Sequence, residues 1–335
     1  MRKNASNLLL ALGIALTGGM FAQAGVVFGT GVNQFTIDFV EIGNPGNADD
    51  TTGIPNPAGR VDYVYQIGKY EVSEDMITKY NAEFGTANGL AITLANMSGD
   101  GGNGADKPAT GVSWNEAARF VNWLNTSQGY QAAYKFTTSG VNDNIVLWTI
   151  ADLGFDSANP FRNSLAQYFL PSYDEWFKAA YYDPTANGGT GGYWDFPTGS
   201  DAAPTAVASG TNSGTAVYGQ PNTQGPAIIT QAGGLSPYGV MGLGGNVFEW
   251  EESALDLVNS ESGEVLGVRG GSWSVNSSSL SSSMRDGRYP SFESISVGFR
   301  VASRSSPEVV PEPASMALWG SLGLMGLLGY RRARN

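Results

Sequence analysis

The sequence predicts one irregular α+β domain, and two features of the chain lead to that prediction. Its 335 residues include 46 glycines and 11% aromatic residues, whereas only 14% of the residues carry a charge. This composition is typical of a loop-rich globule whose core is built largely from aromatic side chains. Segments with strand periodicity are followed along the chain by segments with helix start signals, and no internal repeat or interdomain linker separates them.

The expected strands lie near the N-terminus. Residues 26–42 alternate between apolar and polar side chains, as a half-buried strand does, and one face would carry Phe35, Ile37 and Phe39. A loop rich in Gly, Pro, Asn and Asp covers residues 43–60. A second strand is expected over 63–70, followed by a short helix that Ser73 caps.

Two further helices have clear start signals. Ser113 precedes Glu116, and Ser172 precedes Glu175, each at the spacing of a capping box. The first helix would turn one apolar face inward, made of Trp114, Ala117, Val121 and Leu124. Residues 183–236 consist mainly of Gly, Pro, Thr and Asn, which predicts long loops pinned to the scaffold.

Charge and residue content exclude several classes of function. The net charge of −12 argues against a nucleic-acid partner, because phosphate binding requires clustered Lys and Arg. The chain contains no Cys, which excludes disulfides, thiolate nucleophiles and Cys-ligated metals. It also contains no His, which excludes the Ser-His-Asp mechanism and His-bound iron or zinc.

Both ends of the chain have the pattern of targeting segments. Residues 1–24 read as a signal peptide, with a basic start, an apolar run and a small-x-small cleavage site. At the other end, Pro311-Glu312-Pro313 precedes an apolar stretch and an arginine cluster. Residues 307–335 therefore resemble the PEP-CTERM sorting signal of Gram-negative bacteria, which implies recognition by an exosortase. The alternative is a transmembrane segment kept as a permanent anchor.

The domain between these ends, residues 25–306, resembles the sulfatase-modifying-factor family, whose founding activity is the formylglycine-generating enzyme. The resemblance rests on motifs in the same order over residues 36–303: GKYEVS at 68–73, PATGVSWNEAARFVNWL at 108–124, FLPSYDEWFKAA at 169–180, GNVFEW at 245–250, RGGSW at 269–273 and GFR at 298–300. It implies a loop-rich fold related to the C-type lectins. Taken singly, the motif tryptophans are expected in the core, with Arg269 and Arg300 bracing loops.

The family's copper chemistry has no counterpart in this sequence. Formylglycine-generating members bind copper through two cysteines after the Arg-Gly-Gly-Ser motif, and the matching places here fall near Val275 and Leu280. Neither side chain ligates copper. A related branch holds iron through histidines, which this chain lacks. No copper or iron site is recognisable, and the chain is expected to lack the oxidase activity.

Calcium is the one cofactor that the resemblance leaves open. It implies a site made by the carbonyls of Gly245 and Val247 and the carboxylate of Glu249, although Gly242 stands where a further side-chain ligand is expected. The alternative for Glu249 is a buried carboxylate that accepts hydrogen bonds. Together with Glu251, Glu252 and Asp256 it forms an acidic cluster, which we expect to be a solvated loop rather than a glycosidase pair.

These observations favour an exported, non-catalytic binding or structural domain at the cell surface or in the extracellular matrix. Its ligand would be a glycan or an extracellular protein, and Tyr193, Trp194 and Phe196 are the candidate contact residues. Three alternatives stay open: a family-type oxidoreductase with an unrecognised metal site, a carboxylate-based hydrolase, and a surface-layer component that self-assembles.

Overall fold

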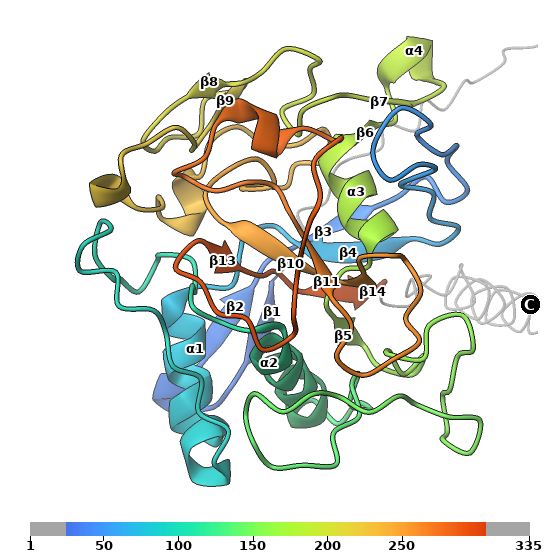
Figure 1. The fold of residues 1–335 in the computed structure, drawn as a ribbon, viewed down its shortest axis with the longest axis vertical. Coiled ribbons are helices and arrows are strands. Elements are labelled where there is room, and N and C mark those ends of the chain that lie inside the picture. The colour runs from blue at the N-terminus through green and yellow to red at the C-terminus, as the bar shows by residue number, and fades with distance from the viewer. Residues whose placement is uncertain (1–24, 306–335) are drawn as a thin grey trace, which may run out of the picture.

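The structure is a computed structural model that describes residues 25–305. The predicted signal peptide and the predicted sorting or transmembrane segment lie outside these residues. Within residues 25–305, no helix is long and apolar enough to cross a membrane. Short strands and helices connected by long loops make up the domain (Figure 1).

The first four-stranded sheet joins the two ends of the domain. Its order is β3-β4-β14-β5, with β3 at Phe39–Ile42, β4 at Tyr65–Gly68, β14 at Ala302–Arg304 and β5 at Tyr168–Phe169. The last strand, β14, is antiparallel to both of its neighbours, so that Ala302 lies opposite Ile67 on one side and Phe169 on the other. The C-terminal segment therefore fills the middle of this sheet.

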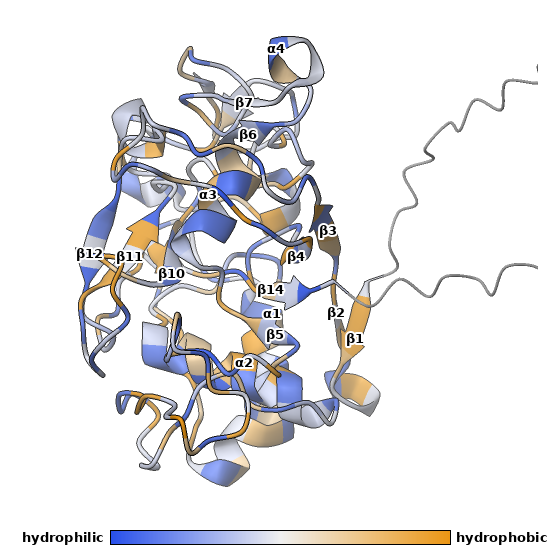
Figure 2. Ribbon diagram, turned by 90° about the vertical axis from the view of Figure 1, so that its right-hand side faces the viewer, coloured by the Kyte–Doolittle hydropathy of each residue, from blue (hydrophilic) through white to orange (hydrophobic). Residues whose placement is uncertain are grey.

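The second four-stranded sheet is centred on the longest strand. Its order is β12-β11-β10-β13, with β12 at Asp286–Arg288, β11 at Leu266–Arg269, β10 at Phe248–Ala254 and β13 at Val297–Gly298. The edge strand β12 is hydrophilic beside the apolar β11 (Figure 2). An ion pair of 2.7 Å between Arg288 and Asp286 keeps charge on that edge, which opposes pairing with another chain.

A bulge interrupts the pairing of β10 with β11. Trp250 lies opposite Val268, but the next paired residue of β10 is Ala254, opposite Leu266. The bulged strand carries extra residues between these pairs, so side chains no longer alternate strictly between the two faces of the sheet. Both faces of β10 are covered, since Glu249, Trp250, Glu251 and Glu252 are all fully buried.

The helices begin where the sequence predicts. Helix α2 spans Trp114–Ser127 and α3 spans Tyr173–Tyr181, and each starts with a complete capping box. Helix α1, at Glu74–Tyr80, follows Ser73, whose hydroxyl accepts the backbone N–H of Met76. A π-helical turn at Asn81–Gly85 continues α1. Other short elements are α4 at Ala186–Gly189, β6 at Tyr182–Asp183, β7 at Gly192–Tyr193, β8 at Thr205–Ala206 and β9 at Thr215–Ala216, together with 3-10 turns at Thr86–Asn88, Asn222–Gln224, Ile229–Gln231 and Ser277–Leu280.

The predicted N-terminal strand is wrong in one respect. Phe35, Ile37 and Phe39 are buried, as the alternation predicts. However, residues 26–42 form three strands, since a 3-10 turn at Gly31–Asn33 folds β1 (Val26–Phe28) back against β2 (Phe35–Ile37). Gly29 and Gly31 have positive φ angles, which reverse the chain at a cost that only glycine avoids. Apolar residues lie before, within and after this turn, so the apolar and polar pattern of residues 26–42 did not indicate it.

Aromatic side chains fill the interior, as the composition predicts. Five motif tryptophans are at most 4% exposed, namely Trp114, Trp123, Trp176, Trp250 and Trp273. Most of them belong to one continuous apolar cluster, while Trp273 packs in a smaller one with Val217 and Val247. Three of the indole N–H groups donate to buried oxygen atoms, for example Trp114 to the carbonyl of Glu251 at 2.9 Å. The indole N–H of Trp273 has no partner among the described residues.

Candidate functional site

Strand β10 carries three buried glutamates, and each is bound by arginine. The carboxylate of Glu249 receives two hydrogen bonds from the Arg300 guanidinium and one of 2.8 Å from the Trp176 indole. Glu251 pairs with Arg269 at 2.9 Å and with Arg285 at 2.7 Å. Arg300 thus makes the fork-like contact that was expected of it. Arg269 braces loops through its terminal nitrogens, which donate to the carbonyls of Ser282, Met284 and Ile54.

The third glutamate belongs to a network that crosses the domain. The Nε of Arg162 lies 3.0 Å from Glu252, and its two terminal nitrogens lie 3.2 and 3.3 Å from the carboxylate of Glu175. Tyr134 donates to Glu252 and Tyr63 donates to Glu175, both at 2.7 Å. Burial raises the pKa of Glu252, and the Arg162 guanidinium opposes this rise.

The expected solvated acidic loop is therefore wrong for three of its four residues. Glu249, Glu251 and Glu252 are fully buried, and only Asp256 is exposed. Their arginine partners lie far away in the sequence, so spacing alone did not indicate the pairing. The arrangement also gives no support to a glycosidase pair, because arginine holds each buried carboxylate in place.

At the predicted calcium site, side chains of the protein itself already bind the expected ligand Glu249. Both oxygens of Glu249 already accept hydrogen bonds from Arg300 or Trp176, so this carboxylate offers no free oxygen to a cation. A Cβ atom at Gly242 would lie 2.4 Å from a carboxylate oxygen of Glu71, which fills the space where the further ligand is expected. Calcium at Gly245, Val247 and Glu249 stays a prediction, and the residues as placed do not fit it.

Glu71 itself is a buried carboxyl group with one free oxygen. Its Oε1 accepts a hydrogen bond of 2.8 Å from Asn246, while Oε2 has no hydrogen-bond partner among the described residues. Burial raises the pKa of Glu71 to about 7, and nearby Arg300 only partly opposes this effect. A proton on Oε2 would lower the cost of burying this group.

The places that correspond to the family's copper cysteines hold apolar side chains. Leu280 is fully buried, and its carbonyl accepts a hydrogen bond of 3.1 Å from Tyr181. Its side chain lies against Gly271, where an added Cβ would be 2.8 Å from a Leu280 methyl group. Val275 is half-buried. Copper does not fit here, since the Leu280 side chain fills this space and carries no donor atom.

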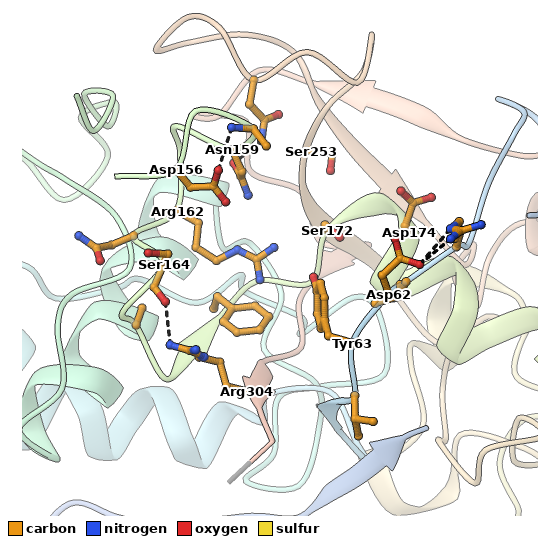
Figure 3. Close-up of a pocket in the computed structure, with 18 of the residues that line it drawn as sticks. Asp62, Tyr63, Asp156, Asn159, Arg162, Ser164, Ser172, Asp174, Ser253 and Arg304 are labelled. Atoms are coloured by element: carbon orange, nitrogen blue, oxygen red, sulfur yellow. Dashed lines mark hydrogen bonds and ion pairs between the residues drawn. The ribbon is translucent and has the colours of Figure 1, made fainter. Parts of the chain in front are cut away.

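The main pocket of the described domain is separate from the predicted calcium and copper sites and is lined in part by Arg162. It has a volume of about 770 Å³ and is lined by the segments 60–64, 156–166 and 172–174, by Ser253 and Leu257, and by the end of β14. In Figure 3 Arg162 lies at its centre, with Asp156 and Asn159 on one side and Tyr63 and Asp174 on the other. We call it the Arg162 pocket.

The floor of the Arg162 pocket is held rigidly. The Arg162 guanidinium lies 3.9 Å from the centre of the Phe169 ring and is clamped between Glu175 and Glu252. Asp174, in the first turn of α3, accepts the backbone N–H of Gly59 at 2.7 Å. Burial raises the pKa of Asp174 to about 6, and neighbouring carboxylates add to the rise.

The three predicted ligand contacts lie outside this pocket. Tyr193 packs against Phe177 and Tyr182, and its hydroxyl contacts Asn47 at 2.6 Å. The Trp194 indole donates to Asp183 at 3.2 Å, and the backbone N–H of Phe196 donates to the carbonyl of Ser200. All three side chains are partly exposed. Their role in binding stays a prediction.

Sequence reasoning missed the Arg162 pocket almost completely. Its one visible signal was the second capping box, which placed Ser172 and Glu175 at a helix start next to Asp174. Arg162, Tyr63 and Asn159 belong to none of the recognised motifs. They meet only because β4, β5 and β10 bring distant segments together.

The loop-rich fold is shared by a class of proteins, and a match to a family model identifies that class. Residues 22–305 match the FGE-sulfatase family, described as the sulfatase-modifying factor enzyme 1-like domain. The chain belongs to this family. Its fold is the loop-rich, C-type-lectin-like α+β fold of the formylglycine-generating enzymes.

Solved structures share this fold at low sequence identity. Variable protein 1 of Treponema denticola is similar with 19% identity and a TM-score of 0.54, over 84% of this chain and 100% of that one. CarF is similar with 20% identity and a TM-score of 0.55, over 81% of this chain and 99% of that one. At this identity the likeness concerns the fold. No curated protein matches the sequence.

Proposed function

We propose that this protein is an exported, non-catalytic binding domain of the sulfatase-modifying-factor family, displayed at the cell surface or in the extracellular matrix. The observation that carries the proposal is Leu280, a buried apolar side chain at the place of a copper cysteine. The absence of Cys and His from the whole sequence supports it. The scaffold is thus kept while the family's metal ligands are missing.

The Arg162 pocket supplies a place for a ligand. Its volume of about 770 Å³ is in the range of small-molecule and side-chain binding sites, and its lining combines planar polar groups with apolar ones. The ion pairs of Arg162 fix the floor before any ligand arrives, which lowers the cost of binding.

Export is the second part of the proposal, and the two ends of the sequence support it. The signal-peptide pattern of residues 1–24 would direct secretion. The PEP-CTERM-like tail would hold the protein at the membrane until an exosortase processes it. Immunoblotting of culture medium and cell fractions, with and without residues 307–335, tests this part. Retention of the untruncated protein in the cytoplasm would contradict it.

An activity assay tests the non-catalytic part. The purified protein is incubated with copper, or with iron, and a cysteine-containing sulfatase-type peptide, and the peptide mass is followed. We expect no formation of formylglycine and no stoichiometric copper or iron in elemental mass spectrometry. The same measurement decides the calcium prediction. Metal-dependent turnover of the peptide would overturn the proposal and favour the oxidoreductase alternative.

A binding screen tests the remaining part. Glycan and extracellular-protein arrays, together with small-molecule probes, are presented to the same purified protein. Binding without turnover is expected. Self-assembly at high concentration with no ligand on any array would instead favour a surface-layer component.

A further inference from the structure

The Arg162 pocket carries an excess of negative charge. Three arginines line it, Arg60, Arg162 and Arg304, whereas the lining and the floor together contain five carboxylates: Asp62, Asp156, Asp174, Glu175 and Glu252. Arg60 is paired with Asp62 at 2.9 Å, and Arg162 with the two glutamates. Arg304 donates to the carbonyl of Ser164 at the rim.

Two of the carboxylates have no cation beside them. Neither Asp156 nor Asp174 forms an ion pair with any residue from 25 to 305. Asp156 accepts the backbone N–H of Ala158 and faces solvent, while Asp174 is half-buried beside Ser172. A half-buried carboxylate that neighbours other carboxylates gains most from a cation that enters the pocket.

Apolar surface accompanies these carboxylates. Tyr63 lines the pocket and is 50% exposed, although its hydroxyl is fixed to Glu175. Leu257 also lines the pocket and is 41% exposed, with a φ of 67°. A leucine in the left-handed region is strained, and strain of this kind concentrates at functional sites. The backbone thus holds an apolar side chain at the mouth.

We propose that the Arg162 pocket binds a ligand with a primary ammonium group on an apolar stem, with Asp174 as the anchor for the ammonium. The chemistry matches the lysine side chain of a peptide or an aliphatic polyamine. The stem lies along Tyr63 and Leu257, where its methylene groups leave water. This inference rests on the proposed binding function and specifies its ligand.

Calorimetric titration of the purified protein tests the inference with four probes. These are a short lysine-containing peptide, the same peptide acetylated on the lysine Nζ, spermidine, and a neutral oligosaccharide. We expect the lysine peptide or spermidine to bind, and the stronger of the two identifies the source of the ammonium group. Acetylation removes the charge and is expected to weaken peptide binding at least tenfold.

Variants of the pocket residues test whether the ammonium group binds in the Arg162 pocket. Asp174→Asn keeps an oxygen for the Gly59 N–H but removes the charge, and is expected to weaken binding of the stronger amine about tenfold. Asp106→Asn changes an exposed carboxylate outside the pocket and should leave binding unchanged. Leu257→Gly removes the apolar contact and the backbone strain, so we expect weaker binding with a fold that stays intact. Melting curves of all variants establish that they are folded.

The outcomes separate this inference from the proposed function. Equal binding of the free and acetylated peptides, or an unchanged affinity in the Asp174→Asn variant, would overturn the ammonium site. Binding of only the neutral oligosaccharide would also overturn it, while the proposed binding function would stand. If none of the probes binds and the glycan and protein arrays are silent too, both proposals fail.

Discussion

Two guanidinium nitrogens of Arg300 donate hydrogen bonds to the carboxylate of Glu249, and both side chains are buried away from water. The guanidinium comes from the segment before β14 and the carboxylate from β10, 51 residues away in the sequence. Arg300 also donates to the carbonyls of Gly68 and Met241, at 2.8 and 2.9 Å. One side chain therefore joins both four-stranded sheets and the loop that precedes β10.

Replacing Arg300 with Met is expected to destabilise the protein by about 3–5 kcal/mol, because Glu249 would stay buried without its cation. The double variant Glu249→Gln, Arg300→Met should lose less, since the unpaired charge is gone. Urea unfolding measures both. As a control, Arg60→Met breaks an exposed pair with Asp62 and should cost less than about 1 kcal/mol. Equal losses of unfolding free energy in Arg300→Met and Arg60→Met would refute the bracing role of Arg300.

Glu71 should make stability fall as the pH rises. Burial raises its pKa from 4.5 to about 7, so the folded state holds the proton more tightly than the unfolded state. The resulting stabilisation is complete below pH 4.5 and is lost as the pH rises through 7. Glu116 and Asp174, with pKa values raised to about 7 and 6, act in the same direction.

The variant Glu71→Gln isolates this contribution, because Glu116 and Asp174 are unchanged. We expect its stability relative to the parent protein to increase between pH 4.5 and 8, as measured by urea unfolding at several pH values. Glu261→Gln, at an exposed position, should leave the profile as it is. A constant difference between Glu71→Gln and the parent across this range would mean that Glu71 does not titrate there.

Leu280 is expected to be a structural side chain of the core. Leu280→Ala should lower the free energy of unfolding by about 2–5 kcal/mol, because it opens a cavity beside Gly271. The matched control is Val275→Ala, at the half-buried second place, which we expect to cost less. Thermal and urea unfolding give both values. A smaller loss at Leu280 than at Val275 would argue against the tight packing that keeps copper out.

The capping box of α3 is expected to contribute to stability through its hydroxyl. Ser172→Ala removes the acceptor for the Glu175 N–H and should cost about 1 kcal/mol. Ser127→Ala, at the C-terminal end of α2, removes a hydroxyl that serves no cap and should change stability by less than about 0.5 kcal/mol. Circular dichroism during urea unfolding distinguishes the two. If the variants behave alike, the cap of α3 is dispensable.

The features that were predictable from the sequence depend on neighbouring residues. Both capping boxes are complete within four residues, and the structure confirms them. The loop-rich fold and the buried tryptophans followed from composition and from the family motifs. In each case the physical cause, a cap or a large apolar ring, can be read from a short segment.

The site depends on contacts that no short segment contains. Glu252 looked like part of a charged loop, because its partners Arg162 and Tyr134 lie 90 or more residues away in sequence. The covering of β10 on both faces added to the error, since a charged run normally indicates at least one solvent-facing side. The Arg162 pocket arises where these distant segments meet, so local patterns did not indicate it.

The central place of β14 in the first sheet has a consequence for the order of events during synthesis. Without Ala302–Arg304, strand β5 has no partner in the sheet and β4 pairs with β3 alone, and without Arg300 the carboxylate of Glu249 has no cation. The chain therefore reaches its native state only after nearly all of the domain has left the ribosome.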